Sequence, residues 1–231
     1  MGMDGHPVPD KGTGMVKVRW STVDGDERAG AHRLLLHAAA AELGVPVSGI
    51  RVDHEPGGRP LLSGAGQGIG VSVSHARRAL AVALCDGAGV GVDVEPLRGL
   101  SGAALAGRWL DPAEARWVRG LPGAGQALAF LWLWTQKEAV GKALGLGLRA
   151  GGMSRPVALP QVWPPAGDGT PVLRPLPGDP GLACGAALAD GGRLVLGVAV
   201  RHAGAAGHRV ELLRVELLRG GGSVDGPPAG C

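Results

Sequence analysis

Three short apolar runs follow one another between residues 69 and 94, and they constrain the fold of this chain more than any other feature. Each run is shorter than a typical helix and ends at polar or glycine-containing residues. The runs are Ile69–Ser74, Ala79–Cys85 and Val90–Val94. Residues 75–78 separate the first two, and a turn at Asp86 and Gly87 precedes the third. The pattern therefore predicts three neighbouring strands of one sheet.

The remaining patterns predict an α+β chain whose two halves are similar. Helices are expected at 28–43, from 111 and at 126–144, and strands at 16–20, 50–55, 182–188, 194–200 and 210–218. Asp111, Pro112 and Glu114 form a capping-box start for the second helix. The Pro- and Gly-rich stretch 151–181 predicts loops with one or two short strands.

Each half thus contains a helix and about three strands. We expect two similar α/β lobes related by a pseudo-twofold, at residues 15–97 and 98–218, with flexible ends at 1–14 and 219–231. A ligand would then bind in the cleft between the lobes.

Composition excludes several classes of protein. The 231 residues are 45% hydrophobic and carry a formal charge of +3, without the basic and aromatic runs that follow a nucleic-acid backbone. No leader-type or membrane-spanning apolar stretch occurs. The three cysteines, Cys85, Cys184 and Cys231, lack CxxC spacing, which favours a reducing compartment. We expect a soluble, cytoplasmic protein with neither a membrane nor a nucleic acid as partner.

Two segments gather charged side chains out of apolar surroundings. Asp93 and Glu95 are two residues apart on a predicted strand, so their carboxylates leave the same face. Glu138 and Lys142 are four residues apart on a predicted helix, one turn from each other, and Trp134 lies one turn earlier. Three carboxylates suit a hard cation such as Mg²⁺, and a lysine can stabilise charge on a phosphoryl group. These residues predict magnesium-dependent phosphoryl transfer.

The ordinary alternative needs no ligand at all. Asp93 and Glu95 would be solvated at a strand end, and Glu138 would pair with Lys142 on a helix surface. Such a pair contributes only about 0.3 to 0.5 kcal/mol and is common.

The two segments resemble the signature pair of a known family. Residues 90–95 read Val-Gly-Val-Asp-Val-Glu, and residues 134–148 follow the pattern Trp-x-x-Lys-Glu-Ala-x-x-Lys-Ala-x-Gly-x-Gly-Leu. Both are similar to the motifs of the 4'-phosphopantetheinyl transferases, specifically the long, surfactin-synthetase-activating type, over about residues 28–218. The resemblance implies a two-lobed monomer of the holo-[acyl-carrier-protein] synthase type. It would move phosphopantetheine from coenzyme A to a serine of an apo acyl or peptidyl carrier protein and release 3',5'-ADP.

The resemblance also implies roles for the site residues. Asp93, Glu95 and Glu138 would bind Mg²⁺ or Mn²⁺, with Glu138 also a candidate base for the carrier serine. Lys142 and His75 would bind the pyrophosphate of coenzyme A and act with Glu138 in catalysis.

Further positions match more local elements of the family. Arg59, in Gly58-Arg59-Pro60, would contact the 3'-phosphate, and Ser74 beside His75 would approach the cofactor phosphates. Lys137 would be a cofactor-binding residue that braces the helix and pocket together with Trp134. Two positions depart from the pattern: Ala76 replaces a serine, and His32 stands where an arginine often holds the nucleotide.

Two other functions stay open. A magnesium-dependent nuclease or phosphohydrolase would need a basic groove, and a non-catalytic domain that binds coenzyme A or a carrier protein would lack a metal ligand. If the protein acts on an acidic carrier, the candidate docking residues near the cleft are Arg98, Arg108, Trp109, Leu110 and Arg116. Polyketide, nonribosomal peptide or fatty acid synthases would supply that carrier.

Overall fold

A computed structural model describes residues 14–147, 153–202 and 207–217 of the chain. The helices of these ranges are α1 (Glu27–Leu43), α2 (Gly102–Trp109), α3 (Pro112–Gly120) and α4 (Gly123–Ala143), with a 3₁₀ turn η1 (Val47–Gly49). The strands are β1 (Met15–Thr22), β2 (Ile50–His54), β3 (Pro60–Gly64), β4 (Ile69–Ala76), β5 (Ala79–Asp86), β6 (Gly89–Pro96), β7 (Arg174–Leu176), β8 (Asp179–Ala189), β9 (Leu194–Arg201) and β10 (Arg209–Arg214).

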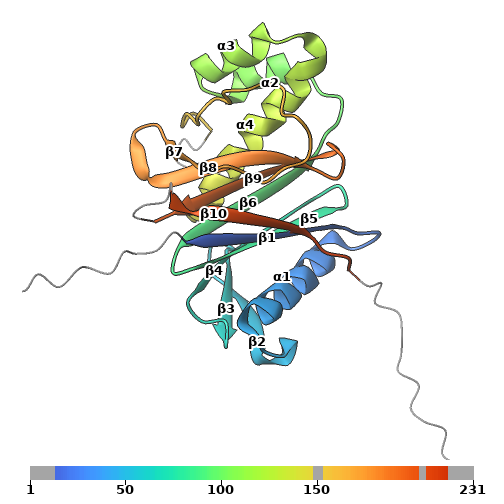
Figure 1. Cartoon of the computed structure of the whole chain (residues 1–231), viewed down its shortest axis with the longest axis vertical. Coiled ribbons are helices and arrows are strands. Elements are labelled where there is room, and N and C mark those ends of the chain that lie inside the picture. The colour runs from blue at the N-terminus through green and yellow to red at the C-terminus, as the bar shows by residue number, and fades with distance from the viewer. Residues whose placement is uncertain (1–13, 148–152, 203–206, 218–231) are drawn as a thin grey trace, which may run out of the picture.

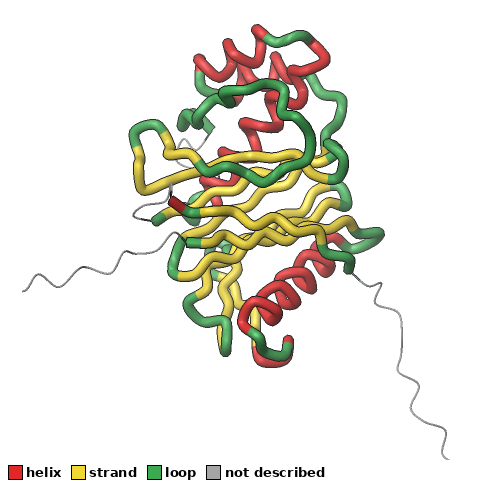
Figure 2. Tube along the Cα trace, in the orientation of Figure 1, coloured by secondary structure: helices red, strands yellow, loops and turns green. Residues whose placement is uncertain are grey.

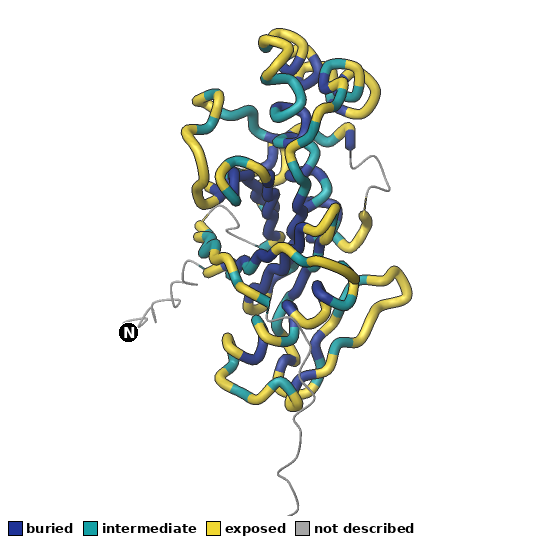
Figure 3. The backbone as a smooth tube through the Cα atoms, turned by 90° about the vertical axis from the view of Figure 1, so that its right-hand side faces the viewer, coloured by how far each residue is buried: buried dark blue, intermediate teal, exposed yellow. Residues whose placement is uncertain are grey.

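These elements form four layers, with two sheets between two layers of helices (Figures 1 and 2). The first sheet has the order β10-β1-β5-β4 and the second β6-β9-β8-β7, while β2 and β3 form a separate hairpin. Side chains of β1 and β5 pack against those of β6 and β9 between the sheets. α1 covers the outer face of the first sheet, and α2, α3 and α4 cover that of the second. Buried residues therefore run through the middle of the molecule (Figure 3).

Local sequence signals account for most element boundaries. α1 begins after Asp26, whose side chain accepts from Ala29 N, and ends at Gly44, whose left-handed backbone few other residues adopt. The predicted capping box of Asp111 and Glu114 is confirmed at the start of α3. The predicted helix 126–144 is confirmed as α4, which begins three residues earlier. The sequence did not predict α2 or β3.

The third of the three apolar runs does not join the sheet of the first two. β4 and β5 pair as predicted, but β6 forms its antiparallel ladder with β9. Alternating apolar residues such as Val90, Val92 and Val94 specify which face of β6 is buried, and they carry no information about the strand that pairs with it. The expectation of one three-stranded sheet was therefore wrong.

Two ladders join parts of the chain that the sequence assigned to different lobes. β6 lies before residue 97 and pairs with β9, while β10 lies after it and pairs in parallel with β1. The division at residue 97 stays a prediction, and the pairing shows that the two sheets exchange strands across it. Within the described ranges, the helices are too short or too polar to cross a membrane.

Candidate active site

The site forms where α4 meets β6, because glycines allow the helix backbone to touch the sheet. A Cβ atom on Gly91 would lie 1.8 Å from the carbonyl oxygen of Ala139, and one on Gly197 would lie 2.3 Å from that of Thr135. Only residues without a side chain fit at these two positions. This close approach brings Glu138 and Lys142 of α4 to the edge of β6 that carries Asp93.

Asp93 is the centre of the polar network at this edge. Its Oδ1 atom accepts from Ser74 Oγ and from Lys142 Nζ, both at 2.8 Å, and the residue is only 7% exposed. The Lys142 ammonium also donates to the carbonyl oxygen of Val92 at 2.9 Å. Lys142 thus pairs with Asp93, and the simple surface pair with Glu138 that the sequence left open is not formed among the described residues.

Serine hydroxyls of β4 connect the two sheets at this point. Val92 N donates to Ser72 Oγ at 3.1 Å, and Val94 N donates to Ser74 Oγ at 3.3 Å. These hydroxyls satisfy backbone groups on the side of β6 that faces away from β9. Ser72 and Ser74 alternate on one face of β4, which is the only sequence signal that could have identified Ser72.

Glu138 lies close enough to these carboxylates to be perturbed by them. Burial and then the neighbouring Asp93 carboxylate raise the pKa of Glu138 to about 7, Lys142 partly opposes this, and Glu95 adds a smaller increase. A carboxyl group with a pKa near neutrality can accept a proton and release it again under ordinary conditions. Glu95 itself accepts from Arg98 Nη1 at 2.5 Å.

The residues fit a divalent cation by their chemistry. Asp93 Oδ2 is buried and has no hydrogen-bond partner among the described residues, and after burial the carboxylates of Asp93 and Glu95 both contribute to the raised pKa of Glu138. Carboxylate oxygens are the ligands that Mg²⁺ prefers. Side chains of the described ranges do not, however, converge into a ready-made group of three or more acidic, histidine or cysteine ligands. Asp93, Glu95 and Glu138 are the residues that would hold such an ion.

Two adjoining hollows next to this cluster are lined by basic side chains. Arg28, His32 and His75 line the first, with a volume of about 250 Å³, and Arg59 and Lys142 line the second, with about 200 Å³. The turn at residues 58–60 and Val73 border both hollows. None of the described residues that line them is acidic. The two hollows form a path lined by basic side chains, which ends at Lys142 and suits a polyanionic ligand.

The predicted phosphate-binding residues differ in how they are placed. His75 is partly exposed, and its Nδ1 lies 3.4 Å from Glu27 Oε2 at the start of α1. Ser74 is 6% exposed and directs its hydroxyl to Asp93, so it positions the Asp93 carboxylate from the side of β4. Arg59 lies at the rim of the second hollow.

Lys137 is not brought to this site. Its side chain is fully buried and makes an ion pair of 2.8 Å with Glu114, and it also donates to the carbonyl oxygen of Arg155. An ammonium group enclosed in this way has no surface for a coenzyme phosphate, so its placement disagrees with a cofactor-binding role. Residues 136 and 138 lie on other faces of α4 because each residue turns the helix by about 100°.

Glu114 is a structural residue whose second role the sequence did not reveal. Its Oε2 atom completes the capping box by accepting from Asp111 N at 3.0 Å, and its Oε1 atom accepts from Val157 N at 2.8 Å. It therefore ties α3, α4 and the segment after residue 153 together. A capping-box pattern predicts only the first of these contacts.

Comparisons with known proteins agree with the motifs. Residues 89–166, which include β6 and α4, match the family model described as the 4'-phosphopantetheinyl transferase superfamily. The chain is also similar to the 4'-phosphopantetheinyl transferase HetI of Nostoc sp. (strain PCC 7120 / SAG 25.82 / UTEX 2576), with 33% identity over 109 residues. That alignment covers 46% of each protein, so the chain matches about half the length of this curated relative. Both similarities support the superfamily.

Proposed function

We propose that this protein transfers the 4'-phosphopantetheine arm of coenzyme A to a serine of an acyl or peptidyl carrier protein and releases 3',5'-ADP. The observation that carries the proposal is the Asp93 network: a buried carboxylate shared by Lys142 and Ser74, beside Glu138, at the end of a basic path. The superfamily match and the activity in the name of HetI support the same reaction. We further propose the long, surfactin-synthetase-activating type, working as a cytoplasmic monomer.

Each residue of the candidate site would have its own role in this reaction. Arg59 and His75 would bind phosphate groups along the two hollows, and Lys142 would meet the pyrophosphate next to Asp93. Glu138 would take the proton of the attacking serine hydroxyl, since its carboxyl group lies beside Asp93 where the path ends. His32 would lie near the nucleotide in the first hollow.

A divalent cation, Mg²⁺ or Mn²⁺, bound by Asp93, Glu95 and Glu138 would neutralise charge on the pyrophosphate. Arg98 on Glu95 and Lys142 on Asp93 would keep the remaining carboxylate oxygens oriented toward it.

The carrier protein would dock near α2 and α3. Trp109 is 43% exposed and carries the guanidinium of Arg108 at 5.2 Å from its ring, and Arg116 is exposed on α3. Acidic carriers from polyketide, nonribosomal peptide or fatty acid synthases would suit this basic, partly aromatic surface. Leu110 is buried, so it would support the surface without contacting the carrier.

Mass spectrometry of a carrier protein tests the proposal. The protein is incubated with coenzyme A, Mg²⁺ and several apo carriers, and each carrier is expected to gain the mass of one phosphopantetheinyl group. The variant Glu138→Gln should reduce the rate at least about a hundredfold because it removes the proton acceptor. An exposed-glutamate variant, Glu42→Gln, should retain the rate. Binding of coenzyme A without any gain in carrier mass would instead favour a non-catalytic domain.

A further inference from the structure

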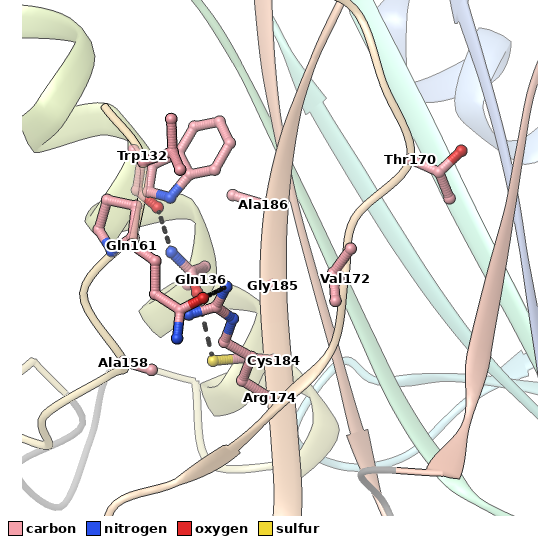
Figure 4. A pocket seen from close by; sticks show the side chains of 12 residues that line it. Trp132, Gln136, Ala158, Gln161, Thr170, Val172, Arg174, Cys184, Gly185 and Ala186 are labelled. Atoms are coloured by element: carbon pink, nitrogen blue, oxygen red, sulfur yellow. Dashed lines mark hydrogen bonds between the residues drawn. The ribbon is translucent and has the colours of Figure 1, made fainter. Parts of the chain in front are cut away.

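A hollow on the other side of α4 from Glu138 combines one arginine, Arg174, with several apolar side chains. Figure 4 shows it between α4, β8 and the segment that leads into β7, with a volume of about 260 Å³. Gln136 faces it from α4 and stands two residues before Glu138, about 200° around the helix. The hollow is therefore separate from the basic path to Lys142.

Three polar side chains meet on one wall of this hollow (Figure 4). Arg174 Nη2 donates to Gln161 Oε1 at a long 3.3 Å, and no acidic side chain of the described residues forms an ion pair with Arg174. Gln136 is only 3% exposed. Its Nε2 donates one hydrogen bond, to Trp132 O at 2.9 Å, and its Oε1 accepts from the Cys184 thiol. A primary amide carries two N–H groups, so among the described residues Gln136 keeps one N–H without a partner in this hollow.

Apolar side chains line much of the rest of the hollow, together with the polar Thr170. Trp132 and Ala186 form the inner surface, and Val172 stands across from Arg174 (Figure 4). Val162 and Val172 are 79% and 71% exposed, although both line the hollow. These two valines offer apolar side chains that a ligand in the hollow can contact.

The chemistry of these lining residues specifies the class of ligand. A guanidinium binds a carboxylate through two parallel hydrogen bonds, and amide N–H groups can add a third. A single arginine balances a monoanion, and the apolar lining residues accommodate a short hydrocarbon chain. We propose that this hollow binds a small monocarboxylate with an apolar chain, with Arg174 holding the carboxylate and Trp132 contacting the chain. The site is independent of phosphopantetheine transfer.

Calorimetric titration of the full chain with hexanoate tests the site. Hexanamide is the matched probe, because it keeps the size and the chain and removes the charge. We expect saturable binding of hexanoate. The affinity for hexanamide should be at least roughly tenfold lower than that for hexanoate, which is the loss expected when a charge-assisted bidentate contact is removed. Tryptophan fluorescence should change over the same concentrations. No saturable binding of hexanoate, or equal affinity for the two probes, would overturn the proposal.

Variants locate the binding in this hollow. Arg174→Gln should weaken hexanoate binding at least about tenfold, whereas Arg33→Gln, on the exposed face of α1, should leave it unchanged. Val172→Glu is a second variant at a side chain that is 71% exposed, so it should fold, and its carboxylate would compete for Arg174. It should weaken binding by a similar factor. Wild-type affinity in a folded Arg174→Gln or Val172→Glu protein would contradict the assignment.

Discussion

Lys137 and Glu138 are adjacent in α4, but their side chains lie on different faces of the helix. One stabilises the fold, and the other lies in the candidate site. Lys137 is 1% exposed and paired with Glu114, and burial lowers its pKa although the ion pair opposes this. Glu138, one residue later, lies beside Asp93 and has a raised pKa. The resemblance to the family motif assigned both residues to one site, because a motif lists residues without stating which face of the helix each occupies.

Removal of the Lys137 charge should destabilise the fold. The variant Lys137→Met would leave the Glu114 carboxylate buried without its cation, which costs about 3 to 5 kcal/mol in comparable pairs. Urea unfolding followed by circular dichroism measures the loss. Lys17→Met is the matched control, since Lys17 pairs with Glu42 at the surface, and it should change stability by less than about 1 kcal/mol. Equal effects of the two substitutions would contradict the buried-pair interpretation.

The raised pKa of Glu138 should make stability depend on pH. Its folded pKa of about 7 lies above the ordinary value of 4.5, so the folded state favours the protonated form. The contribution of this group is fully present below pH 4.5 and is lost as pH rises through 7. In Glu138→Gln this loss is absent. The melting temperature of the variant, measured with a chelator present, should therefore rise relative to wild type between pH 5 and pH 8. Parallel pH profiles would show that Glu138 does not titrate there.

At the scale of elements, the contact between α4 and β6 depends on Gly91. A Cβ atom 1.8 Å from Ala139 O would force the helix away from the strand, and with it Glu138 and Lys142 away from Asp93. Gly91→Ala should cost about 1 to 3 kcal/mol in stability and should also reduce the proposed transferase activity. Gly49→Ala, whose Cβ would meet nothing within 4 Å, is the control and should retain both. Unfolding curves and the carrier assay measure the two effects, and a fully active Gly91→Ala protein would refute this role.

The elements themselves were largely predictable, and their partners were not. Asp26 and Gly44 mark the two ends of α1 through local hydrogen bonds and backbone geometry, which a sequence encodes directly. Half of the candidate site could be predicted in the same way, because Glu138 and Lys142 lie on one helix. The contacts of Ser72 and Ser74 with β6 depend on how the two sheets pack against each other. The periodicity of apolar residues along a strand does not specify that packing. The pairing of Lys137 with Glu114 was missed for the same reason.

At the scale of the whole molecule, the two sheets depend on each other. β6 completes the second sheet and β10 completes the first, so each sheet contains a strand from the other half of the chain. Trp20 of β1 lies between the sheets at 6% exposure and is covered by Arg214 of β10, whose guanidinium stands 5.1 Å from its ring. Asp93 itself is held by one residue from each side, Ser74 and Lys142. The site therefore requires both sheets to be in place.

This interdependence predicts that a fragment of residues 15–97 cannot fold alone. The fragment would lack β9, which pairs with β6, and β10, which pairs with β1, and so would expose strand edges and the apolar faces beside them. Trp20 is the only tryptophan among its residues, so its fluorescence reports on the fragment directly. For the fragment alone we expect a red-shifted emission and no cooperative melt, and we expect a cooperative melt to return when residues 98–231 are added. The full chain, melted under the same conditions, is the control. A cooperative melt of the fragment by itself would mean that the first half is an autonomous domain and that strand exchange contributes little to its stability.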